Sequence, residues 1–144
     1  MRTALRVSEA TSLALHAMAL LAQNGRHALS CNEMATTLSV SEAHLSKVLQ
    51  RLGKQGFVSS TRGPKGGFRL ARPAETVSLL EVYEAIDGPV QFTNCLFETP
   101  VCEANTRCIM GDLLTSVDEQ VLRYLRDTRL TDLIPTEAVA AAGQ

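Results

Sequence analysis

Residues 40–73 read VSEAHLSKVLQRLGKQGFVSSTRGPKGGFRLARP, and this stretch decides the fold. From Ser41 to about Lys54 apolar residues recur at helical spacing, and Ser41 is suited to cap such a helix. The face predicted to be buried consists of Leu45, Val48, Leu49 and Leu52. Residues 57–61 and 68–71 have the composition of short strands, and the Gly- and Pro-rich loop between them is typical of a hairpin.

Two further helices are expected upstream of this stretch. Apolar residues follow the helical period over residues 8–24, which a glycine then ends. Ser30 and Glu33 have the spacing of a capping box that opens a helix through Leu38. Three helices followed by a two-stranded hairpin are the order of a winged helix-turn-helix. The predicted fold class is therefore mainly α with a small β-hairpin.

Downstream, the pattern predicts two more helices separated by an irregular loop. Ser78 and Glu81 form a second capping box, and the helix that it opens ends at Gly88. Residues 89–107 show no period, and a wide apolar stripe follows from about residue 109 to 127. We interpret the stripe as a long C-terminal dimerisation helix; its seam residues are Met110, Leu113, Leu114, Val117, Val121 and Leu125. The alternative is that this helix packs on the first helix of its own chain.

The charge distribution separates the two halves of the chain. Residues 1–73, the predicted DNA-binding domain, carry ten Lys and Arg against three Glu, a formal charge of +7. Residues 74–144 carry four Arg against twelve Asp and Glu, a formal charge of −8. Such asymmetry indicates that one half binds a polyanion, although the opposite charges could also pair within a monomer. Within the acidic half, residues 74–134 hold the loop and the dimerisation helix, and residues 135–144 are expected to be a flexible tail.

The DNA contacts are expected on the third helix and on the hairpin loop. The second helix of a helix-turn-helix lies in the major groove, and short or polar outward side chains let its backbone approach the bases. A cation on a bent loop suits a narrow minor groove, and glycines let the backbone approach a phosphate. The residues assigned to DNA are Ser41, Ala43, His44, Ser46, Lys47, Arg51, Arg62, Gly63, Pro64, Lys65, Gly66 and Gly67. An ordinary solvated hairpin is the alternative for the loop.

Three of the four cysteines lie within fourteen residues of the irregular loop. Cys95, Cys102 and Cys108 are spaced C-x6-C-x5-C, whereas Cys31 stands alone. Thiolates select soft metals, and a short loop can fold three sulfurs around one iron–sulfur cluster. Zinc sites usually use closer pairs of ligands, so the spacing disfavours zinc without excluding it, and three unconnected thiols are the remaining alternative.

Several segments together resemble the IscR/NsrR family of winged-helix regulators. They are the initial Met-Arg, the stretch from Val40 to Pro73, the segment SLLEVYEAIDG and the cysteine triplet, so the resemblance covers about residues 1–134. The resemblance implies a homodimer with a long crossing helix and two heads that read a palindromic operator in double-stranded DNA. It also implies a 4Fe-4S or 2Fe-2S cluster at the three cysteines.

The same resemblance bears on a fourth cluster ligand. IscR-like members use a His three residues after the last cysteine, where this chain has Gly111. NsrR-like members use an acidic residue at the start of the first helix, contributed by the other subunit, and Glu9 stands at that position. Asp112, solvent or a small thiol are the alternatives, and Glu9 also suits the dipole of a helix start. The resemblance thus implies a switch that links the subunits and responds to nitric oxide, oxygen or iron supply.

Other classes of protein find little support in the sequence. It contains no C-x-x-C, no nucleophile with a matched His and Asp, and no Gly-rich loop leading from a strand into a helix, so an enzyme is not expected. No stretch approaches a membrane span or a signal peptide, which predicts a cytoplasmic protein without a membrane partner. The main rival is a metal-independent winged-helix regulator that uses cysteine thiols, a zinc site or a partner protein.

Overall fold

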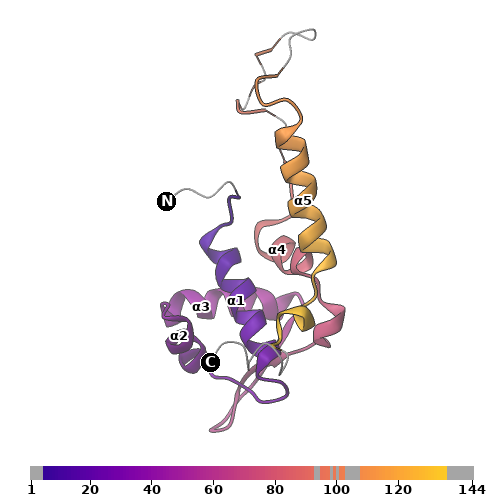
Figure 1. Cartoon of the computed structure of the whole chain (residues 1–144). Helices are drawn as coiled ribbons and strands as arrows, with labels where there is room; N and C mark the ends of the chain where they lie inside the picture. The colour runs from indigo at the N-terminus through magenta and orange to yellow at the C-terminus, as the bar shows by residue number, and fades with distance from the viewer. Residues whose placement is uncertain (1–4, 93–94, 98, 100, 103–107, 136–144) are drawn as a thin grey trace, which may run out of the picture.

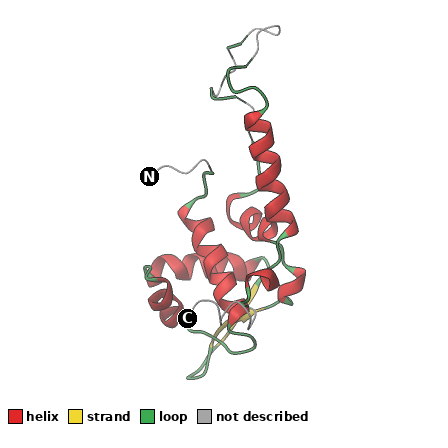
Figure 2. Cartoon of the chain, in the orientation of Figure 1, coloured by secondary structure: helices red, strands yellow, loops and turns green. Residues whose placement is uncertain are grey.

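The structure is a computed structural model that describes residues 5–92, 95–97, 99, 101–102 and 108–135. Its helices form a body from which α5 projects (Figure 1). The elements are α1 (Glu9–Gln23), α2 (Cys31–Leu38), α3 (Glu42–Lys54), β1 (Val58–Thr61), β2 (Gly67–Leu70), η1 (Ala74–Thr76), α4 (Leu79–Asp87), α5 (Leu113–Asp127) and η2 (Leu130–Leu133). The predicted fold class, mainly α with one hairpin, is confirmed (Figure 2).

Side-chain caps fix the starts of the first four α-helices. Ser8 and Ser41 each accept a hydrogen bond from a backbone N–H of the first turn. Ser30 with Glu33 and Ser78 with Glu81 form complete capping boxes, as the sequence predicts. Because these hydrogen bonds satisfy N–H groups that a helix start leaves open, the caps define where each helix begins.

The core lies where α1, α3 and α4 meet. The predicted apolar face of α3 is confirmed, since Leu45, Val48, Leu49 and Leu52 are all buried. α1 contributes small residues that let the helices approach closely, with Ala14 and Ala17 fully buried. Burial of such a cluster supplies most of the folding free energy of a small domain, at roughly 25 cal/mol per Å² of apolar surface.

The hairpin and α5 differ from their predicted bounds. β1 pairs antiparallel with β2, with Val58 opposite Leu70 and Thr61 opposite Gly67. β1 begins one residue later than predicted, and β2 both begins and ends one residue earlier. α5 begins at Leu113 rather than near residue 109, because residues 109–112 form a turn and Gly111 has a φ of 54°. α5 packs mainly on α4, and its beginning lies at the opposite end of the molecule from the hairpin loop (Figure 1). No helix among the described residues is long and apolar enough to cross a membrane.

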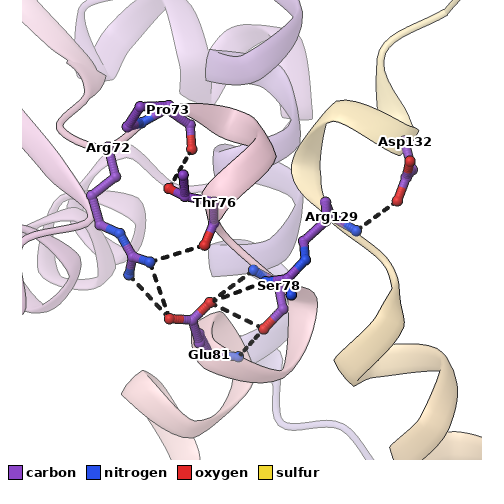
Figure 3. A network of polar contacts seen from close by, with 7 residues as sticks. All are labelled: Arg72, Pro73, Thr76, Ser78, Glu81, Arg129 and Asp132. Carbon is purple, nitrogen blue, oxygen red and sulfur yellow. Dashed lines mark hydrogen bonds and ion pairs between the residues drawn. The ribbon is translucent and has the colours of Figure 1, made fainter.

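A polar network joins the end of the hairpin to α4 and to η2 (Figure 3). Arg72 donates to the Glu81 carboxylate at 3.1 Å and to the carbonyl oxygen of Thr76 at 2.9 Å. Arg129 lies on the other side of Glu81, with Nη1 3.8 Å from Oε2. Desolvation by burial acts to raise the pKa of Glu81, but the Ser78 hydrogen bonds and Arg72 outweigh it and hold that pKa below its ordinary value of 4.5.

Acid is therefore expected to destabilise the fold through Glu81. A carboxyl whose pKa is lower in the folded than in the unfolded state stabilises the fold above its unfolded pKa, and this contribution is lost as the pH falls through the folded pKa. In urea titrations, the free energy of unfolding of Glu81→Gln should fall less than that of the parent below about pH 4.5. Glu75→Gln, at an exposed site on η1, should follow the parent curve. Parallel curves for Glu81→Gln and its parent would contradict this role.

Candidate nucleic-acid interface and cysteine segment

The outward face of α3 presents most of the residues assigned to DNA. Ser41, Ala43 and Lys47 are exposed, and His44 and Ser46 are half-buried. The Ser41 hydroxyl caps α3, because its oxygen accepts a hydrogen bond from the backbone N–H of His44 at 3.3 Å. This cap stabilises the first turn of α3, which in a helix-turn-helix holds the residues that contact the base edges.

The hairpin loop is exposed at its tip and tightly packed at its base. Arg62, Gly63, Pro64 and Lys65 are exposed, and both cations lack an ion-pair partner among the described residues. Unpaired cations on such a tip are available to phosphates or to a minor groove.

The two glycines at the base of the loop serve the fold itself. A Cβ on Gly66 would lie 2.2 Å from the carbonyl oxygen of Thr61. A Cβ on Gly67 would lie 2.6 Å from the Leu29 carbonyl group, and Gly67 has a φ of 151°. Leu29 and Phe68 exchange two backbone hydrogen bonds across this contact. The fold itself therefore requires glycine at both positions, and their contact with phosphate stays a prediction.

Alanine at two glycines should change stability in opposite directions. Gly67→Ala places a Cβ against backbone in a strained conformation, so it should cost about 1–3 kcal/mol of unfolding free energy. Gly53→Ala lies in the last turn of α3, where the added Cβ makes only ordinary contacts at 3.8 Å, and should add up to about 0.5–1 kcal/mol. Thermal and urea unfolding measure both. Equal stability of the two variants would contradict the packing described at the loop base.

Arg51 is placed differently from its prediction as a DNA contact. Its Nη2 donates to the carbonyl oxygen of Ile86 at 2.5 Å, and Gln55 Nε2 donates to that of Ala85 at 2.6 Å. Both acceptors belong to the last turn of α4, whose carbonyl groups a helix end leaves open. The position of α3 is thereby coupled to the end of α4. Periodicity could not reveal this pairing, because it joins residues more than thirty positions apart.

The start of α1 is also attached to both helices. Ser8 Oγ donates to Asp87 Oδ1 at 2.8 Å, which joins the α1 cap to the last residue of α4. Glu9 Oε1 lies 3.6 Å from His44 Nδ1, which joins the first turn of α1 to α3. The Glu9 side chain is 83% exposed, so it is accessible to a second subunit. These contacts and those of Arg51 and Gln55 form what we call the α4 junction.

The cysteine segment follows directly on the α4 junction. α4 ends at Asp87 with Gly88 as its C-cap, and the segment then leads to Cys95, which is half-buried, and to Cys102 and Cys108, which are exposed. Three thiols form a soft donor set whose chemistry suits an iron–sulfur cluster. In the arrangement described, however, no three His, Cys, Asp or Glu side chains of residues 5–92, 95–97, 99, 101–102 and 108–135 lie close enough to hold one metal ion. Binding would therefore require the sulfurs to converge.

Cys31 differs from these three in its surroundings. Its Sγ lies 3.6 Å from the carbonyl oxygen of Glu42, between α2 and α3. Burial, with the Glu42 carboxylate as a second cause, raises the pKa of the Cys31 thiol. A thiol that stays protonated is a poor ligand and nucleophile, so Cys31 has a packing role.

The apolar stripe of α5 divides into two faces. Leu125 is buried in its own chain and Val121 packs against the same core, so the alternative of intrachain packing holds for these two seam residues, with α4 as the partner. Leu113 and Tyr124 are exposed, at 54% and 61%. Together with Val117 they form a line along α5 that is rotated by about 90° around the helix axis from Val121 and Leu125. The seam remains a prediction for this line, to which Tyr124 is an addition that the aliphatic pattern missed.

Comparison with known proteins identifies the family. The family described as Rrf2, iron-dependent transcriptional regulator, matches residues 7–136. The chain belongs to the Rrf2 family. It is 30% identical over 127 residues to the HTH-type transcriptional regulator IscR of Cereibacter sphaeroides, covering 87% of this chain and 82% of that protein. A putative HTH-type transcriptional regulator of Aquifex aeolicus is 29% identical over 132 residues, covering 90% and 92%.

Solved structures of Rrf2 regulators have the same fold. CymR, described as the global cysteine regulator of B. subtilis, superposes with a TM-score of 0.74 at 25% identity, covering 90% of this chain and 95% of CymR. T. potens IscR superposes with a TM-score of 0.69 at 24% identity, covering 90% and 86%. This Rrf2 protein is accordingly a DNA-binding transcriptional regulator and not an enzyme, and the expected likeness to IscR is confirmed.

Proposed function

We propose that this Rrf2 regulator is a homodimeric repressor whose affinity for a palindromic operator is set by an iron–sulfur cluster at Cys95, Cys102 and Cys108. The observation that carries the proposal is a dense set of soft donors in the segment that leaves the α4 junction. The likeness to IscR supports it. A 4Fe-4S or 2Fe-2S cluster would supply a group that reacts with nitric oxide or oxygen and depends on iron supply. Glu9 of the other subunit is the proposed fourth ligand.

The α4 junction gives the chain a physical route from the cysteines to DNA. Arg51 and Gln55 hold α3 on the last turn of α4, and Ser8 holds the start of α1 on Asp87. A displacement of the segment after Gly88 therefore acts on carbonyl and carboxylate groups that position α3. Differential affinity of the two arrangements for the operator is what would make such a displacement regulatory.

A thiol-based regulator is the second candidate. Cys102 and Cys108 are exposed, and the described residues do not gather three ligands. CymR, described as a global cysteine regulator, has the same fold and supports this candidate. In that case the thiols themselves would change state on oxidation, without a metal.

Serine substitutions distinguish the two candidates. After anaerobic purification, Ser at Cys95, Cys102 or Cys108 should each remove most of the visible iron–sulfur absorbance, because an alkoxide is a harder donor than a thiolate. Cys31→Ser is the matched control and should keep the absorbance of the parent. Glu9→Ala should retain a cluster that is lost faster on titration with nitric oxide or oxygen, with operator binding followed in the same samples. A colourless parent protein that still binds its operator would contradict the cluster and favour the thiol-based regulator.

A further inference from the structure

A hollow of about 270 Å³ lies between α4, α5, the segment after α4 and the residues before α1. Its walls are apolar where Val90, Val117 and Val121 face it, and its polar lining consists of Arg6, Tyr83, Gln91 and Asp118. Neither the DNA contacts nor the proposed cluster ligands use any of these residues, although Val117 and Val121 are also among the predicted seam residues. The volume is just below the range of pockets that hold drug-sized ligands, so it suits a smaller molecule.

Two charged groups that line this hollow, Asp118 and Arg6, lack an ion-pair partner among the residues that the structure describes. Oδ2 of Asp118 is buried and accepts no hydrogen bond, although Arg6 lines the same space. Arg6 and Asp118 are not within ion-pair distance of each other or of any oppositely charged group in the described part of the chain. A buried carboxylate oxygen without a donor is costly, so a donor from solvent, a ligand or a second subunit is expected to complete this site.

We propose that the hollow binds a free α-amino acid with an apolar side chain. Its ammonium group would donate to Asp118, its carboxylate would pair with Arg6, and its side chain would lie against the valines. A zwitterion matches two opposite charges that line one space without pairing, whereas a simple amine or acid would leave one of them unmatched.

An amino acid there would act on the regulator independently of the cysteines. Gln91 belongs to the segment between α4 and Cys95, and Arg6 lies two residues before Ser8, which caps α1 on the α4 junction. The bound molecule would hold these two segments and α5 together. It would thus be a second input on the position of α3, and it does not depend on whether a cluster or free thiols occupy the cysteine segment.

Calorimetric titration of the full chain tests the proposal. L-Leucine and L-methionine are the probes, and N-acetyl-L-leucine and 4-methylpentanoate are controls that lack the ammonium group. We expect saturable binding of at least one probe, and at least about ten-fold weaker binding of both controls, because the buried charge then stays unpaired.

Variants assign the binding to this site. Asp118→Asn should weaken the probe about ten-fold or more, whereas Glu119→Gln, at an exposed position of the same helix outside the hollow, should bind as the parent does. Arg6→Gln is the second test and does not depend on how Asp118→Asn folds. It should weaken binding of L-leucine but not of L-leucinamide, which lacks the carboxylate. Absence of saturable binding, equal binding of N-acetyl-L-leucine, or unchanged affinity in both Asp118→Asn and Arg6→Gln would overturn the proposal.

Discussion

We expect a protein that carries Leu113→Asp and Tyr124→Asp to sediment as a monomer. Both side chains are largely exposed in the single chain, so the substitutions should leave its fold intact, as circular dichroism would show. In a dimer they would place charges inside an apolar seam, where an unpaired buried charge costs several kcal/mol. Val121 would be an unsuitable site for this test, because it packs against the core of its own chain.

Thr115→Asp with Arg126→Ser is the matched control for this experiment. It changes the net charge by the same amount, but both positions are exposed and lie on the opposite side of α5. Sedimentation equilibrium over a range of concentrations should show the parent and the control as dimers. A dimer of unchanged stability in the Leu113→Asp, Tyr124→Asp protein would exclude the exposed line of α5 as the seam.

The second large effect is expected on DNA binding. Lys47→Ala and Arg62→Ala remove cations from α3 and from the hairpin loop, which the structure places at the surface. Each contact is worth about 1–3 kcal/mol, and the two lie on different elements, so the double variant should lose about 2–6 kcal/mol of operator affinity. The slope of log K against log salt should also become shallower, since fewer phosphates are neutralised.

Mobility shifts with an operator selected by the parent protein from palindromic duplexes would measure this loss. Arg123→Ala with Arg126→Ala removes two exposed cations of α5, in the acidic half of the chain, and should leave the affinity nearly unchanged. If Lys47→Ala with Arg62→Ala binds as the parent does, α3 and the hairpin loop do not form the DNA surface. If both double variants lost the same amount of operator affinity, the effect would reflect net charge rather than contacts made by α3 and the hairpin loop.

Local patterns predicted the parts of this fold that depend on local physics. The capping boxes at Ser30 and Ser78 and the buried face of α3 follow from hydrogen bonds and spacings within a few residues, and all are confirmed. The start of α5 was placed too early, because the stripe continues into a turn whose glycine conformation no periodicity reveals. Helical spacing describes a face, but it does not say where hydrogen bonding begins.

Contacts between residues that are far apart in the chain could not be predicted from local sequence patterns. The charge of Arg51 and its place on α3 predict a DNA contact, which stays a prediction, but they do not reveal that its guanidinium donates to the end of α4. The proximity of Glu9 to His44 and the buried oxygen of Asp118 likewise depend on how helices pack. A wide apolar stripe cannot by itself be divided between an intrachain face and a seam, which is why Leu125 was assigned to the seam although it is a core residue.

The projection of α5 away from the hairpin has an electrical consequence. The half of the chain that carries +7 contains α3 and the hairpin loop, while α5, which projects away from the hairpin loop, belongs to the half that carries −8. Such a molecule is a dipole, and the field of a DNA duplex exerts a torque on it before any atom touches. Rotation into the productive orientation thus begins during the approach, at separations up to about the 8 Å over which physiological salt screens charge. Molecules that arrive with the cysteine end foremost are repelled by the same field, so few encounters are spent in the wrong orientation.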